Sequence, residues 1–94
     1  MAPNADPRRG VYAISIAAEI VGTNVQNLRV YERRGLVEPQ RTGGGTRLYS
    51  EDDVARLARI VELLQDGLNL AGIAKVIELE TELTRLRRRL QRSG

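Results

Sequence analysis

The order of glycines and apolar residues between positions 12 and 50 constrains the fold more than any other feature of this sequence. One short apolar segment ends at Gly22, a second ends at Gly35, and the triple glycine of residues 43–45 follows. Glycine commonly ends a helix, because it adopts the left-handed conformation at no steric cost. Two helices joined by a short turn that contains glycine make a helix-turn-helix. We therefore expect two helices followed by a glycine-turned hairpin.

The first helix is expected to begin after Ser15, as its N-cap, and to end at Gly22. Small side chains at positions 17 and 18 would let a second helix approach closely. The residues expected to face inward are Ile16, Ile20 and Val21. Residues 11–15 are interpreted as a short strand or an extended lead into this helix. Residues 1–10 contain two prolines and no apolar periodicity, so we expect a disordered tail there.

The second helix is expected over residues 25–34, with Thr23 or Asn24 as its N-cap. At helical spacing its core stripe is Val25, Leu28 and Tyr31. Its other faces carry amides, which bond adenine edges, and guanidiniums, which bond guanine or phosphate. The residues on these faces are Gln26, Asn27, Arg29, Val30, Arg33 and Arg34. An ordinary solvated face is the alternative, but such faces usually mix Glu with Lys, so we predict a DNA-facing helix.

Residues 36–49 predict a β-hairpin, anchored by Leu36 and Val37, with the glycines supplying the positive φ angles of its turn. The residues expected to line its tip are Arg41, Thr42, Thr46 and Arg47. A glycine-rich tip lets backbone N–H groups approach phosphate oxygens. The tip lacks the Lys-Ser/Thr ending of a nucleotide-binding loop. A plain flexible turn is the alternative interpretation.

A third helix is expected to begin with a capping box, in which Ser50 is the N-cap and Asp53 the third helical residue, and to end at Gly67. The residues of its expected apolar face are Val54, Leu57, Ala58, Ile60, Val61 and Leu64. Asn69 is expected to cap a fourth helix that runs from Leu70 to about residue 92 and buries apolar residues in its first part.

Apolar residues in the fourth helix follow the alternating spacing of three and four that is typical of a coiled-coil seam. They are Val76, Leu79, Leu83, Leu86 and Leu90. Because so short a helix is marginal in water alone, the seam must pack on something. A homodimer, parallel or antiparallel, is the favoured interpretation, and packing back onto the same chain is the alternative.

Composition narrows the function. With no cysteine and no histidine, the chain has no disulfide framework and none of the common zinc, haem or iron–sulfur ligand sets, and no spacing suggests catalysis. We expect no enzyme and no cofactor. The apolar runs are too short to span a bilayer, and no signal peptide is evident, so a cytoplasmic, nucleoid-associated protein without membrane contact is expected. Five arginines in residues 23–49 and five in residues 83–94 flank an acidic segment, which suits double-stranded DNA.

The ordered motifs resemble the DNA-binding domain of the MerR family of transcription regulators. The matching pieces are "LRVYERRGL", the strand "EPQR", the wing "GTRLYSEDDV" and the later "LNLAGI". The segments "VYAISIAAEIVG" and "LNLAGIAKVIEL" further resemble the HspR-type heat-shock repressors. The expected fold is therefore mainly α: a winged helix-turn-helix over residues 11–79 with a short β-hairpin wing, and a coiled-coil dimerisation helix over residues 80–94.

The resemblance implies a homodimer with an antiparallel coiled coil, a second helix that enters the major groove, and a wing that holds flanking backbone. It implies DNA contact or wing bracing for Arg29, Tyr31, Arg47 and Tyr49, and Asn24 completes the expected DNA-binding set. Val30 departs from the family pattern, which usually places a tyrosine there. Metal-sensing relatives keep cysteines that this sequence lacks.

The expected function is that of a dimeric repressor on an inverted-repeat operator, with a DnaK-like chaperone as co-repressor. The alternatives are a small architectural, excisionase-like DNA-binding protein and a coiled-coil protein-interaction module.

Overall fold

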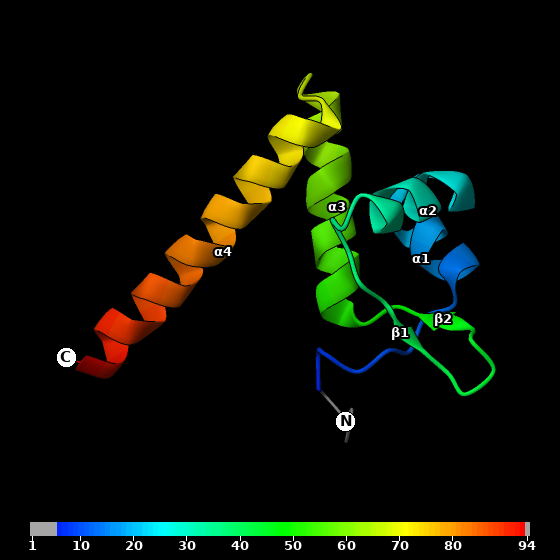
Figure 1. Ribbon diagram of the computed structural model, residues 1–94, viewed down its shortest axis with the longest axis horizontal. Helices are drawn as coiled ribbons and strands as arrows, with labels where there is room; N and C mark the ends of the chain where they lie inside the picture. Colours follow the sequence, from blue (N-terminus) through cyan, green and yellow to red (C-terminus); the bar gives the residue numbers. More distant parts are fainter. Residues whose placement is uncertain (1–5, 94) are drawn as a thin grey trace. The chain divides into compact units, whose positions relative to one another are not determined.

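The computed structural model describes residues 6–93, which form helices and one small hairpin (Figure 1). In chain order the elements are α1 (Ile14–Val21), α2 (Val25–Arg33), β1 (Gln40–Arg41), β2 (Arg47–Leu48), α3 (Glu51–Gln65) and α4 (Leu70–Ser93). The chain divides into two compact units, Met1–Glu62 and Leu63–Gly94. The expected mainly α fold with a hairpin wing is confirmed.

Helix α1 packs against α2 through its alanines, since Ala17 and Ala18 are buried and the two helices are in contact. The predicted N-cap, Ser15, is wrong: the cap is Ala13, which makes no side-chain capping bond. The predicted inward positions Ile16 and Ile20 are also wrong, because these side chains are 45% and 51% exposed. The alanines and the half-buried Val21 share one helix face at spacings of three and four, which turns residues 16 and 20 outward.

Helix α2 has both of its expected ends. The backbone N–H of Asn27 donates to the Asn24 side-chain oxygen at 2.8 Å, so Asn24 is the N-cap. Gly35 has a φ of 75° and donates its N–H to Glu32 O at 2.9 Å, while the Leu36 N–H bonds Tyr31 O at 3.0 Å. These two bonds close the helix end and point the chain into the hairpin.

The hairpin is antiparallel and pairs Gln40 with Leu48 and Arg41 with Arg47. A chain segment from before α1 extends it, because the N–H of Tyr12 bonds Tyr49 O at 2.9 Å and the N–H of Tyr49 bonds Tyr12 O at 2.7 Å. The expected short strand over residues 11–15 is thus a single bridge. Two residues per strand are too few for independent stability, so the hairpin depends on its attachments to the rest of the unit.

Residues 6–10 do not match the predicted tail. The Gly10 N–H donates to the Gln40 side-chain oxygen at 2.7 Å, and the Asp52 N–H donates to Pro7 O at 2.9 Å. A Cβ added at Gly10 would lie 2.7 Å from the backbone oxygen of Leu48, so only glycine fits this approach. The remainder of the predicted tail, residues 1–5, lies outside the described residues.

Helix α3 begins with the expected capping box: Asp53 N–H donates to Ser50 Oγ at 3.0 Å, and Ser50 N–H donates to Asp53 Oδ2 at 2.9 Å. Its buried side chains are Leu57, Ile60 and Leu63. The predicted core position Ala58 is exposed, because the buried stripe advances in steps of three residues from Leu57.

Helix α4 is capped by Asn69, whose side-chain oxygen accepts from the Gly72 N–H at 2.8 Å. Ile73 and Ile77 are buried. The coiled-coil leucines are exposed: Leu79 66%, Leu83 46%, Leu86 43% and Leu90 72%. Across residues 6–93, no helix combines the length and apolarity needed to cross a membrane.

Candidate nucleic-acid interface

The outward face of α2 presents the side chains that the sequence pattern placed there. Gln26, Arg29, Arg33 and Arg34 are exposed, and Val30 is half-buried. Asn27 is half-buried as well, and its side-chain amide donates to Thr23 Oγ1 at 2.8 Å. Because the Asn24 side chain also bonds the helix backbone, both asparagines have structural roles at the start of α2. One amide and three guanidiniums remain open on this face.

The two tyrosines in the expected DNA-binding set are buried instead of presented at the surface. Tyr31 is 4% exposed and Tyr49 is 0% exposed. Burial raises the pKa of the Tyr31 hydroxyl, and a hydrogen bond with the Thr23 side chain partly lowers it. Within residues 6–93, the Tyr49 hydroxyl is fully buried and has no hydrogen-bond partner. Both rings therefore lie in the core of the described structure and are not presented at its surface.

A carboxylate on α2 holds both strands of the wing. Glu32 Oε2 accepts from Arg41 Nη2 on β1 at 2.8 Å, and Glu32 Oε1 accepts from Arg47 Nε on β2 at 2.5 Å. The Glu32 side chain is 20% exposed, against 47% for Arg41 and 28% for Arg47. We name these three residues the wing triad. It joins the helix expected in the groove to the hairpin expected on the backbone.

Electrostatics of the wing triad favour the ionised carboxylate. Partial burial raises the pKa of Glu32, but the hydrogen bonds and positive charges of Arg47 and Arg41 outweigh it, so this pKa lies below its ordinary value. The carboxylate is therefore charged at neutral pH and partly neutralises two guanidiniums. This contact was not predicted from the sequence. The hairpin register is the feature that could have indicated it, because Arg41 lies opposite Arg47 and two like charges in that position need an acidic partner.

The wing tip is built from residues 42–46, all exposed. Thr46 N–H donates to Thr42 Oγ1 at 3.2 Å, and Gly45 has a φ of 85°, which L side chains rarely adopt. Arg41 Nη1 also donates to Gly45 O at 3.1 Å, so the same guanidinium that bonds Glu32 fixes the turn. The tip is thus shaped by its own hydrogen bonds, with both threonine side chains at the surface.

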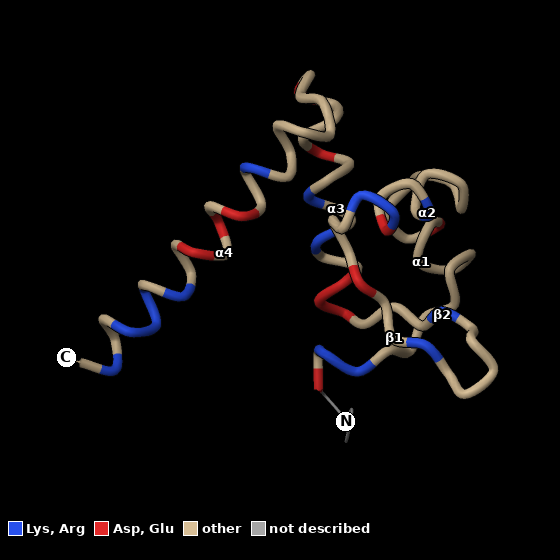
Figure 2. The backbone as a smooth tube through the Cα atoms, viewed as in Figure 1, with Lys and Arg blue, Asp and Glu red and all other residues tan. Residues whose placement is uncertain are grey.

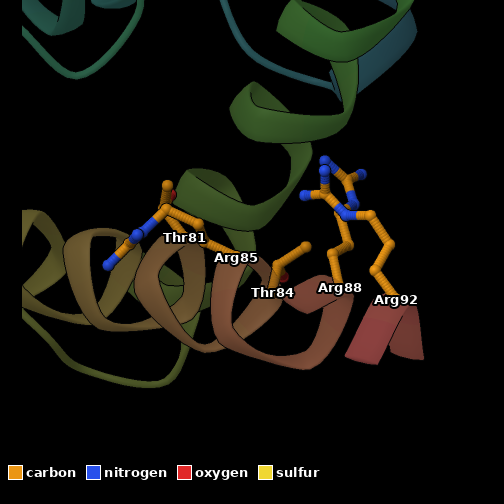
Figure 3. A pocket seen from close by; sticks show the side chains of 5 residues that line it. All are labelled: Thr81, Thr84, Arg85, Arg88 and Arg92. Atoms are coloured by element: carbon orange, nitrogen blue, oxygen red, sulfur yellow. The ribbon is translucent and has the colours of Figure 1, made fainter. Parts of the chain in front are cut away.

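Helix α4 carries a second concentration of arginine. Figure 2 shows its acidic residues in the first half, after one basic residue near its start, and the rest of its basic residues toward the C-terminus. Thr81, Thr84, Arg85, Arg88 and Arg92 line an open hollow on this helix, where Arg88 and Arg92 extend toward each other and Arg85 turns away (Figure 3). Arg85 forms an ion pair with Glu82 one turn earlier. Among residues 6–93, no group of three or more acidic side chains is placed to hold a metal ion.

Two helices joined by a short turn, with a hairpin held against the second helix, define a winged helix-turn-helix of the transcription-regulator class. The family model described as MerR HTH family regulatory protein matches residues 12–80. The chain belongs to the MerR family. Since this is a family of transcription regulators, the expectation that the chain is not an enzyme is confirmed.

Similar proteins agree with this assignment. The putative heat shock protein HspR of Streptomyces coelicolor is 49% identical over 80 residues, which cover 84% of this chain and 53% of that protein. The chain thus spans about half the length of this relative. A MerR-family regulator from Bacillus cereus superposes with a TM-score of 0.68 at 32% identity, covering 87% of this chain and 64% of that one.

A third similar protein was solved with DNA. The structure of HiNmlR, a MerR family regulator lacking the sensor domain and bound to promoter DNA, superposes with a TM-score of 0.65 at 25% identity. The superposition covers 85% of this chain and 67% of that one.

Proposed function

We propose that this chain is a sequence-specific regulator of transcription, a dimeric repressor of the HspR type that binds an inverted-repeat operator in double-stranded DNA. The observation that carries the proposal is the outward face of α2, which presents Gln26, Arg29, Arg33 and Arg34 beside a wing fixed to the same helix. Membership of the MerR family and the similarity to a regulator bound to promoter DNA support it.

On this proposal α2 enters the major groove. Gln26 bonds an adenine edge, and Arg29 or Arg33 bonds a guanine edge. The half-buried Val30 offers an apolar contact of the kind that recognises a thymine methyl group. Arg34, the C-cap of α2, is exposed and reaches phosphate.

The wing follows the neighbouring backbone in this proposal. The hydroxyls of Thr42 and Thr46 and the N–H groups of the glycine-rich tip are the donors offered to phosphate oxygens. Tyr31 and Tyr49 act from the core by holding α2 and the wing. Arg41 and Arg47 lie at the same surface, but the wing triad partly neutralises their charge.

The exposed seam of α4 supports a homodimer. Leu79, Leu83, Leu86 and Leu90 are each at least 43% exposed and lie on one stripe with Val76. Leucines at successive a and d positions, left at the surface of one chain, are the pattern that a second coiled-coil helix buries. Pairing two such helices removes this stripe from water.

Charges beside the seam favour antiparallel pairing. With Val76, Leu83 and Leu90 at a positions, Glu80 and Glu82 occupy e and g in the first heptad, and Arg87 and Arg89 occupy the same positions in the second. In an antiparallel pair e faces e and g faces g, so each glutamate of one chain meets an arginine of the other. A parallel pair brings only Glu82 opposite Arg87. The antiparallel arrangement therefore has twice as many complementary contacts.

A DnaK-like chaperone as co-repressor and a position on the cytoplasmic nucleoid complete the proposal. The similarity to a protein named for the heat-shock response supports the chaperone, and the proposed binding to DNA supports the nucleoid. Co-precipitation of such a chaperone with the chain on operator DNA, compared with scrambled DNA, tests the first of them.

Selection from random duplex DNA tests the proposed function. The expected result is enrichment of one inverted repeat, bound by two chains per duplex. A footprint that spreads along the DNA with concentration would instead identify an architectural, excisionase-like protein. Failure to enrich any sequence, with tight binding to a protein partner, would identify a coiled-coil interaction module.

A further inference from the structure

The wing triad reduces the positive charge that the wing offers to DNA, because Glu32 pairs with the guanidiniums of two arginines that would otherwise attract phosphate. Arg41 and Arg47 are direct partners across the hairpin. Like charges directly opposite each other destabilise a pair of strands. Glu32 meets both, from a different element, with one carboxylate oxygen for each arginine. The position of Glu32 on α2 therefore lets one carboxylate pair with both of the like charges that the hairpin register places opposite each other.

The triad also fixes where the wing lies relative to α2. Each strand has only two residues, so the hairpin needs attachments. Arg41 bonds Glu32 and the carbonyl of Gly45 at once, and Arg47 is only 28% exposed. Both guanidiniums are thus held in one geometry and share a single negative charge. Their combined effect on a polyanion is closer to one positive charge than to two.

We propose that Glu32 is a specificity-determining residue. By pairing with Arg41 and Arg47, it fixes the wing on α2 and reduces the sequence-independent attraction of these two arginines to phosphate. This inference rests on the proposed DNA-binding function. Phosphate contacts supply most non-specific affinity and carry no sequence information directly, whereas a fixed wing sets the register of α2 in the groove. A carboxylate at this site therefore lowers affinity for random DNA while preserving affinity for the operator.

The test compares Glu32→Gln with wild type on the selected operator and on random duplex, at several salt concentrations. Glutamine keeps the shape and removes the negative charge, so one more positive charge per chain faces phosphate. The slope of log K against log salt is expected to steepen by about 0.9 per chain. Between about 50 and 200 mM salt, that is an additional loss of about 3.5-fold in affinity per chain. The ratio of operator to random affinity is expected to fall.

Glu19→Gln is the matched control, since it makes the same change in net charge at an exposed position on α1. It is expected to leave the slope and the affinity ratio close to wild type. A purely structural role for Glu32 would weaken binding with an unchanged slope, and that result would overturn the inference, as would equal effects of the two variants. If wild type shows no preference for any duplex, the proposed function itself fails, so the two failures are distinguishable.

Thermal melting of Glu32→Gln verifies that any change in binding comes from a folded chain. Glu32→Asp adds a second readout, because it keeps the charge and shortens the reach to the wing. It is expected to retain the wild-type slope while losing part of the affinity ratio. A slope as steep as that of Glu32→Gln would contradict the role assigned to the charge.

Discussion

Removing the hydroxyl of Tyr49 is expected to stabilise the protein, although it deletes a polar group from a residue that the family resemblance associates with DNA contact or wing bracing. Tyr49 is 0% exposed, and its hydroxyl has no hydrogen-bond partner among the described residues. Burying a hydroxyl without a partner costs about 1–3 kcal/mol in proteins, and Tyr49→Phe removes that cost while keeping the ring. For a domain of this size, each kcal/mol changes Tm by about 4–8 °C.

Thermal unfolding followed by circular dichroism measures this effect, with the affinity for operator DNA measured alongside it. Tyr49→Phe is expected to raise Tm and leave the affinity unchanged. The matched control is Tyr12→Phe, because the Tyr12 hydroxyl donates to Glu51 Oε2 at 2.6 Å. That variant is expected not to raise Tm. A lower Tm for Tyr49→Phe, or a loss of operator affinity, would show that the Tyr49 hydroxyl forms a stabilising bond and is not an unpaired buried group.

Three further perturbations test other parts of the structure. The double variant Glu82→Arg/Arg87→Glu keeps the net charge and the complementary contacts of a parallel coiled coil, but it leaves an antiparallel coiled coil with like-charge contacts only. Sedimentation equilibrium is expected to show a weaker dimer, and an unchanged dimer would mean that the helices are parallel. Ser50→Ala removes the side-chain oxygen that accepts from the Asp53 N–H, and denaturant unfolding is expected to report a loss of about 1 kcal/mol; an unchanged midpoint would contradict the capping role. The folded-state pKa of Glu32 is lowered, so the ionised carboxylate contributes its full stability above the unfolded pKa and loses it as pH falls through the folded pKa. The stability difference between wild type and Glu32→Gln should therefore shrink in acid. A constant difference would show that the charge of Glu32 does not contribute to stability.

Local signals explain what the sequence predicted correctly. Asn24, Ser50 and Asn69 each cap a helix within three residues of the donors that they bond, and such short-range pairs can be recognised in sequence. Gly22 and Gly35 end helices for the same local reason. The helix-turn-helix and the hairpin were therefore predictable from residue order alone.

Contacts between distant segments explain the errors. The sequence pattern predicts a tail for residues 6–10, because no local pattern reveals that their hydrogen bonds reach Gln40 and Asp52. Apolar periodicity predicts Ile16 and Ile20 in the core, but it does not say which face a neighbouring helix covers. The small Ala17 and Ala18 lie on the buried face instead.

The candidate site was predicted as a set of side chains, but not as an arrangement. The sequence placed Arg29 and Arg33 correctly on the outward face of α2, because helical spacing alone fixes that face. The pattern also predicts a phosphate contact for Arg47, but residue order does not reveal that Glu32, on another element, accepts a hydrogen bond from the same guanidinium. Ion pairs between segments that only the tertiary structure brings together cannot be predicted from residue order.

In the proposed function, α2 reads base edges in the major groove of two symmetric half-sites. Methylation protection of guanine N7 on the selected operator tests this proposal, because this atom lies in the major groove. We expect protection at two inverted positions separated by a whole number of helical turns, with two chains per duplex. Protection that is uniform along the DNA, or confined to one position with a single chain bound, would contradict it.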